Sequence, residues 1–117
     1  MKVKKIDNIT AETVQNGIGV TKKVLISHEE APNFAMRCFK IQPGGSMPNH
    51  TNQVEHEQYE LSGSAKIGID EDVIDVKKDD IIFIPANTPH WYRNSGDEPF
   101  IFLCLVPNKP DVTTILK

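Results

Sequence analysis

Short runs of hydrophobic residues that alternate with polar ones recur along the chain, and helical periodicity is nearly absent. Gly, Pro, Asn and Asp separate these runs, which are rich in β-branched and aromatic side chains. This pattern is typical of an all-β sandwich or barrel. It predicts strands at residues 19–26, 35–41, 56–61, 65–69, 72–76, 81–84, 90–94 and 100–106.

Both ends of the chain lack this strand pattern. Residues 8–14 are the only segment that hints at a helix or an irregular arm, with Thr10 as its N-cap. The tail is expected to leave the barrel, and it could end in one more strand or lie across a partner. We therefore expect a single domain, 1–117, with an N-terminal arm at 1–18, a barrel core at about 19–106 and a C-terminal tail at 107–117.

Length and charge narrow the class of protein. A chain of 117 residues suits one domain with a real core, and 13 basic against 16 acidic residues give a net charge of -3. That balance argues against a nucleic-acid partner. The longest apolar runs, such as 100–106, are too short to cross a bilayer, and no signal-peptide pattern follows the basic N-terminus. We expect a cytoplasmic protein with no membrane partner.

The chain has two cysteines, Cys38 and Cys104, each inside an apolar segment. A disulfide or a thiolate ligand would give them a function. Two small buried hydrophobic residues are the simpler interpretation in a reducing cytoplasm, and we favour it. Neither belongs to a CxxC pair, so the sequence does not indicate a zinc ribbon or a redox motif.

Three of the four histidines, His50, His56 and His90, fall between residues 44 and 94, and a small β-barrel could gather them around one metal ion. Neutral imidazole is the commonest metal ligand in proteins. The remaining histidine, His28, lies outside this stretch and is expected in an exposed loop. The alternative is three polar side chains left in a metal-free barrel, which is costly in an apolar interior.

The alternation of a strand predicts which polar residues accompany the histidines. Asn52 shares the face of His50 and is either a fourth, weaker ligand or a hydrogen-bond partner of the ligands, whereas Gln53 faces away. Gln58 and Glu60 share the face of His56, and Tyr92 shares that of His90. Gln58 is interpreted as a contact to substrate or bound water, or as a satisfied interior amide. Tyr92 either lines the cavity or packs in the barrel.

At these residues the sequence resembles the cupin superfamily. The first cupin motif, G-x5-H-x-H-x3-E-x6-G, is matched in spacing from Gly44 to Gly63. The second motif, G-x5-7-P-x-G-x2-H-x3-N, is matched from Pro85 to Asn94. The resemblance spans residues 34–106 and implies a double-stranded β-helix, or jelly-roll, barrel. Its short length is similar to small single-domain cupin 2 proteins, including manganese-containing ones with a His-rich site.

Several motif positions depart from the family pattern. Asn52 stands where the family has its second histidine, and His56 stands where it has glutamate. The resemblance thus implies a neutral set of His50, His56 and His90, with Asn52 as a weaker ligand, because an amide oxygen binds less strongly than imidazole. Asn87 replaces a glycine, and Asp79 or Asp80 replaces the glycine that opens the second motif.

The resemblance implies one divalent transition metal per chain, with manganese or iron favoured over zinc or nickel. Such a site suggests dioxygenase-like C–C cleavage of a small oxygenated molecule, which we rank first. The alternatives are Lewis-acid isomerisation, epimerisation or elimination of a sugar or keto acid, and non-catalytic small-molecule binding. The Lewis-acid route needs a general base, for which Glu60 and Tyr92 are the only candidates. Small cupins also pair as homodimers, and apolar Val112, Ile115 and Leu116 are consistent with such pairing.

Overall fold

The computed structural model describes residues 2–116, and within them it confirms the all-β prediction. One 3₁₀ turn, Ile6–Asn8, precedes the strands, and these residues contain no α-helix. No helix among them is long and apolar enough to span a bilayer. The strands are β1 (Glu12–Thr13), β2 (Ile18–Ile26), β3 (Phe34–Thr51), β4 (His56–Ser62), β5 (Ser64–Ile69), β6 (Asp72–Lys77), β7 (Ile81–Ile84), β8 (His90–Arg93), β9 (Phe100–Pro107) and β10 (Thr114–Ile115).

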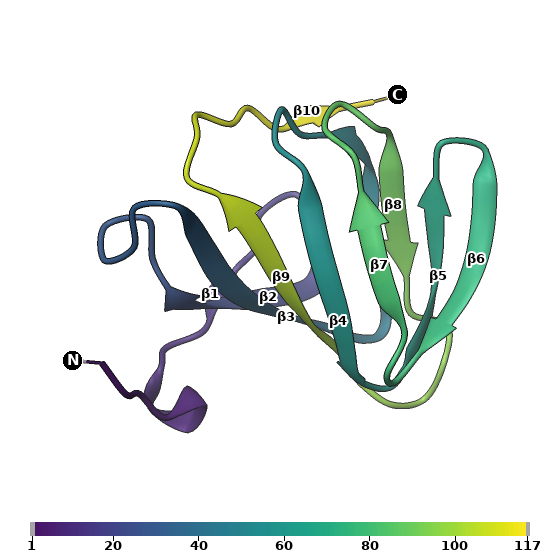
Figure 1. The fold of residues 1–117 in the computed structure, drawn as a ribbon. Helices are drawn as coiled ribbons and strands as arrows, with labels where there is room; N and C mark the ends of the chain where they lie inside the picture. The colour runs from purple at the N-terminus through teal and green to yellow at the C-terminus, as the bar shows by residue number, and fades with distance from the viewer. Residues whose placement is uncertain (1, 117) are drawn as a thin grey trace.

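All strand pairs are antiparallel, and the sheet curls into a jelly-roll (Figure 1). The main path runs β6-β5-β8-β3-β9-β4-β7. The strands β1, β2 and β10 lie off this path, with β2 and β10 pairing to β3 and β1 pairing to β2. Because β3 pairs with four other strands, it joins the two halves of the curled sheet. This arrangement is the double-stranded β-helix that the two motifs predicted.

Pro43, Gly44 and Gly45 are turn residues that indicated a break after the predicted strand at 35–41, but β3 continues through them as one bent strand. Gly44 has φ +81°, a conformation that L side chains rarely adopt. Asn94 holds the bend in place: its backbone pairs with Gly44 and Gly45, and its side-chain amide donates to the carbonyl of Ile41. The last residue of the second motif therefore fixes the corner at which the first motif begins.

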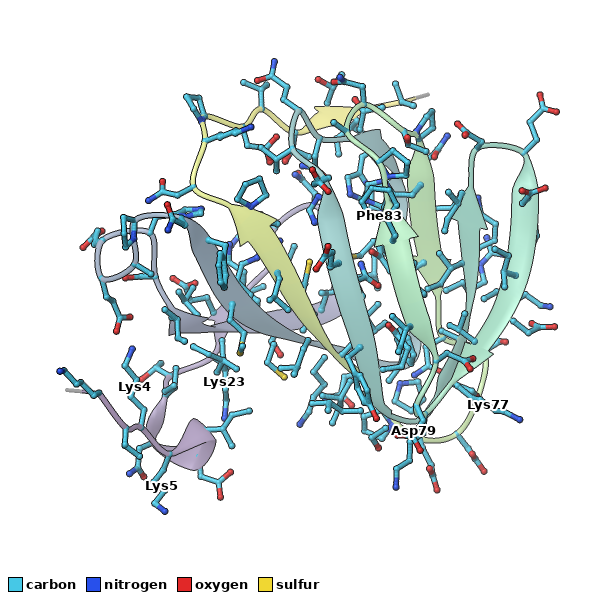
Figure 2. All side chains as sticks on the ribbon, in the orientation of Figure 1. Lys4, Lys5, Lys23, Lys77, Asp79 and Phe83 are labelled. Carbon is cyan, nitrogen blue, oxygen red and sulfur yellow. The ribbon has the colours of Figure 1, made fainter. Side chains whose placement is uncertain are left out.

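Tight turns occupy several positions where the family has glycine. Asn87 has φ +62°, as expected for a residue that tolerates the left-handed conformation. Asp79 has φ +74° in the turn that joins β6 to β7, and Figure 2 shows it at the lower end of the sheet. Its carboxylate accepts a hydrogen bond from the hydroxyl of Tyr59 at 2.8 Å. Asn87 and Asp79 thus both adopt the left-handed conformation that glycine adopts without strain.

Alternate residues of the strands fill the interior. The ring of Phe102 stacks between the rings of Phe39 and Tyr92, and the centroid of each of those rings lies 5.3 Å from the centroid of Phe102. Cys38 and Cys104 are buried, as predicted, and both are free, so they form no disulfide. The core consists of Val20, Ala35, Phe39, Ile41, Val54, Ala65, Ile67, Val76, Ile82, Ile84, Tyr92, Phe100, Phe102, Cys104 and Val106.

Short strands form near both ends of the chain, where the sequence showed no strand pattern. Residues 8–14, predicted to form a helix or an irregular arm, form no helix: the 3₁₀ turn ends at Asn8, and β1 within this segment pairs with β2. Near the other end, β10 pairs with β3 of the same chain, so Ile115 lies opposite His50. The tail therefore forms the additional strand that was one of its two predicted alternatives, and Figure 1 shows β10 crossing one end of the sheet.

Candidate functional site

A cavity of about 340 Å³ opens at the end of the barrel that β10 crosses. Residues from both sides of the curled sheet line it, together with residues 13–16 of the N-terminal arm. Apolar side chains of Phe39, Met47 and Phe102 form part of its wall. The predicted polar residues that line it are His50, Asn52, His56, Gln58, His90 and Tyr92.

His50 and His90 lie side by side because β3 and β8 pair in register at these two residues. Their ring centroids are 4.1 Å apart. Nδ1 of His50 lies 2.7 Å from the carbonyl of Pro48, and Nδ1 of His90 lies 2.9 Å from that of Thr88. A carbonyl oxygen only accepts, so each Nδ1 carries the proton and each Nε2 keeps a free lone pair.

His56, on β4, is oriented differently. Its ring centroid lies 5.7 Å from that of His90. Its Nε2 lies 3.2 Å from Oδ1 of Asn52, and its Nδ1 lies 3.2 Å from Sγ of Cys104. A guanidinium nitrogen of Arg37 is 3.4 Å from the same Nδ1. Within residues 2–116, therefore, no three His, Cys, Asp or Glu side chains are already grouped as a closed metal site.

Two tautomers of His56 are consistent with these contacts. If Nδ1 accepts from Arg37, then Nε2 carries the proton and donates it to Asn52. If Nδ1 donates to Sγ of Cys104, then the lone pair of Nε2 faces the lone pairs of the Asn52 oxygen. Two acceptors that face each other repel unless a cation or a hydrogen-bond donor lies between them. The second tautomer thus gives three imidazole nitrogens and one amide oxygen, a donor set that fits a divalent transition metal.

The C-terminal tail sets the orientation of Asn52. The amide nitrogen of Asn52 donates to Oδ2 of Asp111 at 3.1 Å and to Oγ1 of Thr113 at 2.9 Å. Its oxygen is therefore directed toward His56 rather than toward the tail. Gln53 is exposed and does not line the cavity, as predicted, and its backbone N–H donates to Oδ1 of Asp111.

Burial keeps the three imidazoles neutral. Desolvation, aided by the positive charge of Arg37, lowers the pKa of His56 to about 3. Desolvation also lowers the pKa of His90 to about 4 and lowers the pKa of His50. Only neutral imidazole binds a metal, so all three rings are in the ligating form at pH 7.

The other three predicted site residues take different positions. Gln58 is buried, and its amide nitrogen donates to the hydroxyl oxygen of Tyr92. Tyr92 is 3% exposed, and burial raises the pKa of its phenol, so the phenol stays protonated. Glu60 is fully buried but does not line the cavity, because it lies two residues beyond Gln58 on β4. Its carboxylate oxygens have no hydrogen-bond partner among the described residues.

Sequence reasoning missed several residues that line the cavity. Arg37 and Cys104 both do so, and both follow the inward phase of their strands. Arg37 alternates with Ala35 and Phe39, which are buried, so its phase alone could have placed a charge inside the barrel. Lys22 also lines the cavity, and it gave the same signal, because it shares the strand face of buried Val20 and lies between Val20 and Val24 in the alternation.

Residues 37–106 match a family model described as Cupin domain. The chain belongs to the cupin family. A curated relative, 1-methylthio-D-xylulose 5-phosphate methylsulfurylase of Rhodospirillum rubrum, is 31% identical over 98 residues, which cover 81% of this chain and 62% of that protein. The chain spans less than two thirds of the length of the curated relatives that it matches.

Two solved structures show the same fold. The polyketide cyclase RemF from Streptomyces resistomycificus is 28% identical with a TM-score of 0.89, covering 100% of this chain and 87% of that one. A cupin-2 domain from Rhodospirillum rubrum is 26% identical with a TM-score of 0.83, covering 94% of this cupin and 75% of that chain. The likeness therefore extends beyond the residues of the family model to both termini.

Proposed function

We propose that this cupin is a metal-dependent enzyme that acts on a small carbonyl compound such as a keto acid or a sugar. His50, His56 and His90 would hold one divalent transition metal, with Asn52 as the weaker fourth ligand. When bound, such an ion supplies Lewis acidity to a carbonyl oxygen. Manganese, iron, zinc and nickel all accept this neutral donor set of nitrogen and amide oxygen.

The observation that carries the reaction class is the Gln58–Tyr92 pair. The amide of Gln58 donates to the hydroxyl oxygen of Tyr92, which leaves the phenolic hydrogen free to donate into the cavity. A neutral phenol at that place stabilises negative charge on a substrate oxygen, as an enolate requires. We therefore rank Lewis-acid enolate chemistry, as in isomerisation, epimerisation or elimination, above oxygenation.

The absence of a carboxylate base narrows the substrate further. Glu60, one of the two predicted bases, does not line the cavity. Tyr92, the other, has a raised pKa, which disfavours its phenolate form. Among the described residues that line the cavity there is no Asp or Glu. A substrate whose C–H bond is already acidic, such as a 1,3-dicarbonyl compound, needs the least help from a base. The side chains would then bind and orient the enolate rather than create it.

The named relatives support a carbonyl substrate. The polyketide cyclase is named for polyketides, which carry repeated carbonyl groups, and the methylsulfurylase is named for a ketose phosphate. Neither name specifies an oxygenation. These proteins are similar to this cupin at 28% and 31% identity, so their substrate classes guide the choice of compounds to screen.

Dioxygenase-like C–C cleavage is the second candidate. Three neutral imidazoles without a carboxylate ligand also suit an iron or manganese ion that binds a chelating enolate. The two candidates share enolate binding and differ in whether dioxygen is consumed. A non-catalytic binding protein would have the same cavity and no turnover.

Metal content tests the site first. We expect protein purified without chelator to contain about one transition metal ion per chain by mass spectrometry, and His50→Ala and His90→Ala to lose most of it. His28→Ala is the matched control, because His28 is exposed and does not line the cavity. Unchanged metal content in both cavity variants would refute the proposed site.

Turnover tests the reaction class. Metal-loaded protein would be incubated with 1,3-diketones, 2-oxo acids and ketose phosphates, with and without dioxygen. Product formation under nitrogen supports the Lewis-acid proposal, whereas substrate-dependent oxygen uptake supports the second candidate. Saturable binding without product in either atmosphere would show a binding protein and overturn both enzymatic proposals.

We also propose a homodimer that forms through the outer face of β7. Ile81 is 77% exposed and Phe83, which Figure 2 labels on this strand, is 55% exposed. β7 ends the main path of the sheet, and charged residues, which commonly protect an edge, are absent from its four positions. Light scattering of Phe83→Glu should show a monomer, with Val73→Glu on β6 as the control. A Phe83→Glu dimer would exclude this face.

A further inference from the structure

The walls of the cavity carry positive charge and no negative charge. Arg37 on β3 and Lys22 on β2 both line it. In the part of the chain that the structure describes, no aspartate or glutamate side chain does so, although the protein has a net charge of -3. Neither cation forms a salt bridge within residues 2–116. The local charge of the cavity is therefore opposite to that of the whole molecule.

Arg37 is held in place by neutral contacts. Its guanidinium lies 5.0 Å from the ring centroid of Phe39, and one terminal nitrogen donates to Sγ of Cys104 at 3.2 Å. Its Nε is buried and has no hydrogen-bond partner among the described residues. A partly buried guanidinium with an unused N–H and no carboxylate beside it is costly, because the charge has lost water without gaining an anion.

Nearby acidic groups do not neutralise Arg37. Burial raises the pKa of Glu60 to about 8, so its carboxyl is mostly protonated at pH 7. Asp111 is already bound to the side chain of Asn52 and the backbone of Gln53. The positive charge of Arg37 is thus available to a ligand in the cavity.

We propose that Arg37, with Lys22, binds the oxyanionic group of the substrate, a carboxylate or a phosphate, through charge-assisted hydrogen bonds. Guanidinium groups match both anions because their N–H donors form a planar fork. His56 separates the two parts of the site: its Nδ1 faces Arg37 and its Nε2 faces Asn52. The substrate would therefore carry its reacting carbonyl and its anionic group on opposite sides of this ring.

This inference deepens the proposed function and rests on it only for the statement that the anion belongs to the substrate. Anion binding itself needs no metal, so metal-free protein separates the two proposals. Loss of the metal site would leave the anion site measurable, and a missing anion site would leave metal content unchanged.

The chain offers a direct spectroscopic test, because it has only two arginines, Arg37 and Arg93. Each gives one Nε–H signal in a ¹⁵N spectrum. The guanidinium of Arg93 also lies over an aromatic ring, 5.6 Å from the ring centroid of Trp91. Arg93 is exposed, however, and does not line the cavity. Arg93 is therefore a matched internal control for Arg37.

Metal-free protein would be titrated with acetate and, separately, with inorganic phosphate at constant ionic strength, with chloride as the reference salt. We expect the Arg37 signal to shift saturably with at least one of the two anions while the Arg93 signal stays nearly constant. The anion that binds more tightly identifies carboxylate or phosphate as the recognised group. Equal responses of the two signals, or no saturable shift of Arg37 with either anion, would overturn the proposal.

Variants make the assignment functional. Calorimetry with the better anion should show an affinity at least about tenfold lower for Arg37→Gln, while Arg93→Gln keeps the parent affinity. Arg37→Lys keeps the charge without the fork and should fall between them. If Arg37→Gln does not fold, the Nε–H signals of Arg37 and Arg93 in the unaltered protein still test whether an anion binds at Arg37. An equal loss in Arg93→Gln would also refute a specific site at Arg37.

Discussion

Oδ1 of Asn52 lies 3.2 Å from Nε2 of His56. Asn52 directly follows β3, and His56 is the first residue of β4. The tail residues Asp111 and Thr113 hold the other end of the Asn52 amide, so its oxygen keeps this direction. At the position where the family usually has its second histidine, this chain thus directs an amide oxygen toward Nε2 of His56. This relationship makes Asn52 the most informative residue to change.

Asn52→His should tighten metal binding and Asn52→Leu should weaken it, each by about tenfold, because imidazole is the better ligand and leucine has no donor atom. The measurement is competition with a chromophoric chelator. Gln53→Leu is the control, since Gln53 is exposed and points away. Parent-like affinity in both Asn52 variants would place Asn52 outside the ligand set.

Metal retention should persist at mildly acidic pH. The pKa of His56 is lowered to about 3 and that of His90 to about 4, so protons compete for these rings well below the ordinary imidazole range. We expect metal content by mass spectrometry to be similar at pH 7 and pH 5. Half-loss of metal near pH 6.5 in folded protein would contradict the neutral, buried state of these rings.

The same lowered pKa values predict acid sensitivity of the metal-free protein. The unfolded chain binds protons on these histidines below pH 6.5 while the folded protein does not, so their contribution to stability is lost as pH falls toward 4. The free energy of unfolding in urea should therefore decrease from pH 7 to pH 5. The Glu60→Gln background isolates this effect, because it removes the opposing titration of Glu60. A flat profile in that background would contradict the prediction.

Glu60→Gln should stabilise the protein increasingly as pH rises. The pKa of Glu60 is raised from 4.5 to about 8, so the unfolded state loses its proton first and the contribution of Glu60 to stability is lost between these values. The difference in unfolding free energy between Glu60→Gln and the parent should therefore grow from pH 4.5 to pH 8. We expect a gain on the order of a few kcal/mol at most. Parallel pH profiles would show that the carboxyl is not destabilising when charged.

Gly68→Ala should destabilise the fold by about 1–3 kcal/mol through overpacking. Gly68 on β5 pairs with Trp91 on β8, and an added Cβ would overlap with the indole ring of Trp91. Urea unfolding followed by the fluorescence of Trp91, the single tryptophan, measures the change. Gly96→Ala is the control, since its added Cβ would meet nothing closer than 3.4 Å. Equal stability of the two variants would refute the close packing.

Local sequence determined most of the strand pattern and the faces of many side chains. The period-two alternation of side chains is a property of each strand, so it placed Gln58 and Glu60 on the face of His56 without any knowledge of neighbouring strands. The apolar segments around the two cysteines likewise indicated that both are buried. The spacing of the two motifs likewise indicated the jelly-roll fold. Turn residues such as Asn87 were readable because the left-handed conformation is a local preference.

Only the tertiary structure decided how these faces meet. It showed that β3 bends at Gly44 without ending, because long-range hydrogen bonds from Asn94 hold the corner. It also placed Glu60 behind the cavity rather than in it, and brought Arg37 to the far side of His56. Distances of a few ångströms between residues remote in sequence depend on strand register and tail packing. A strand's own alternation carries no information about these, so the chemistry of the cavity emerged only from the folded chain.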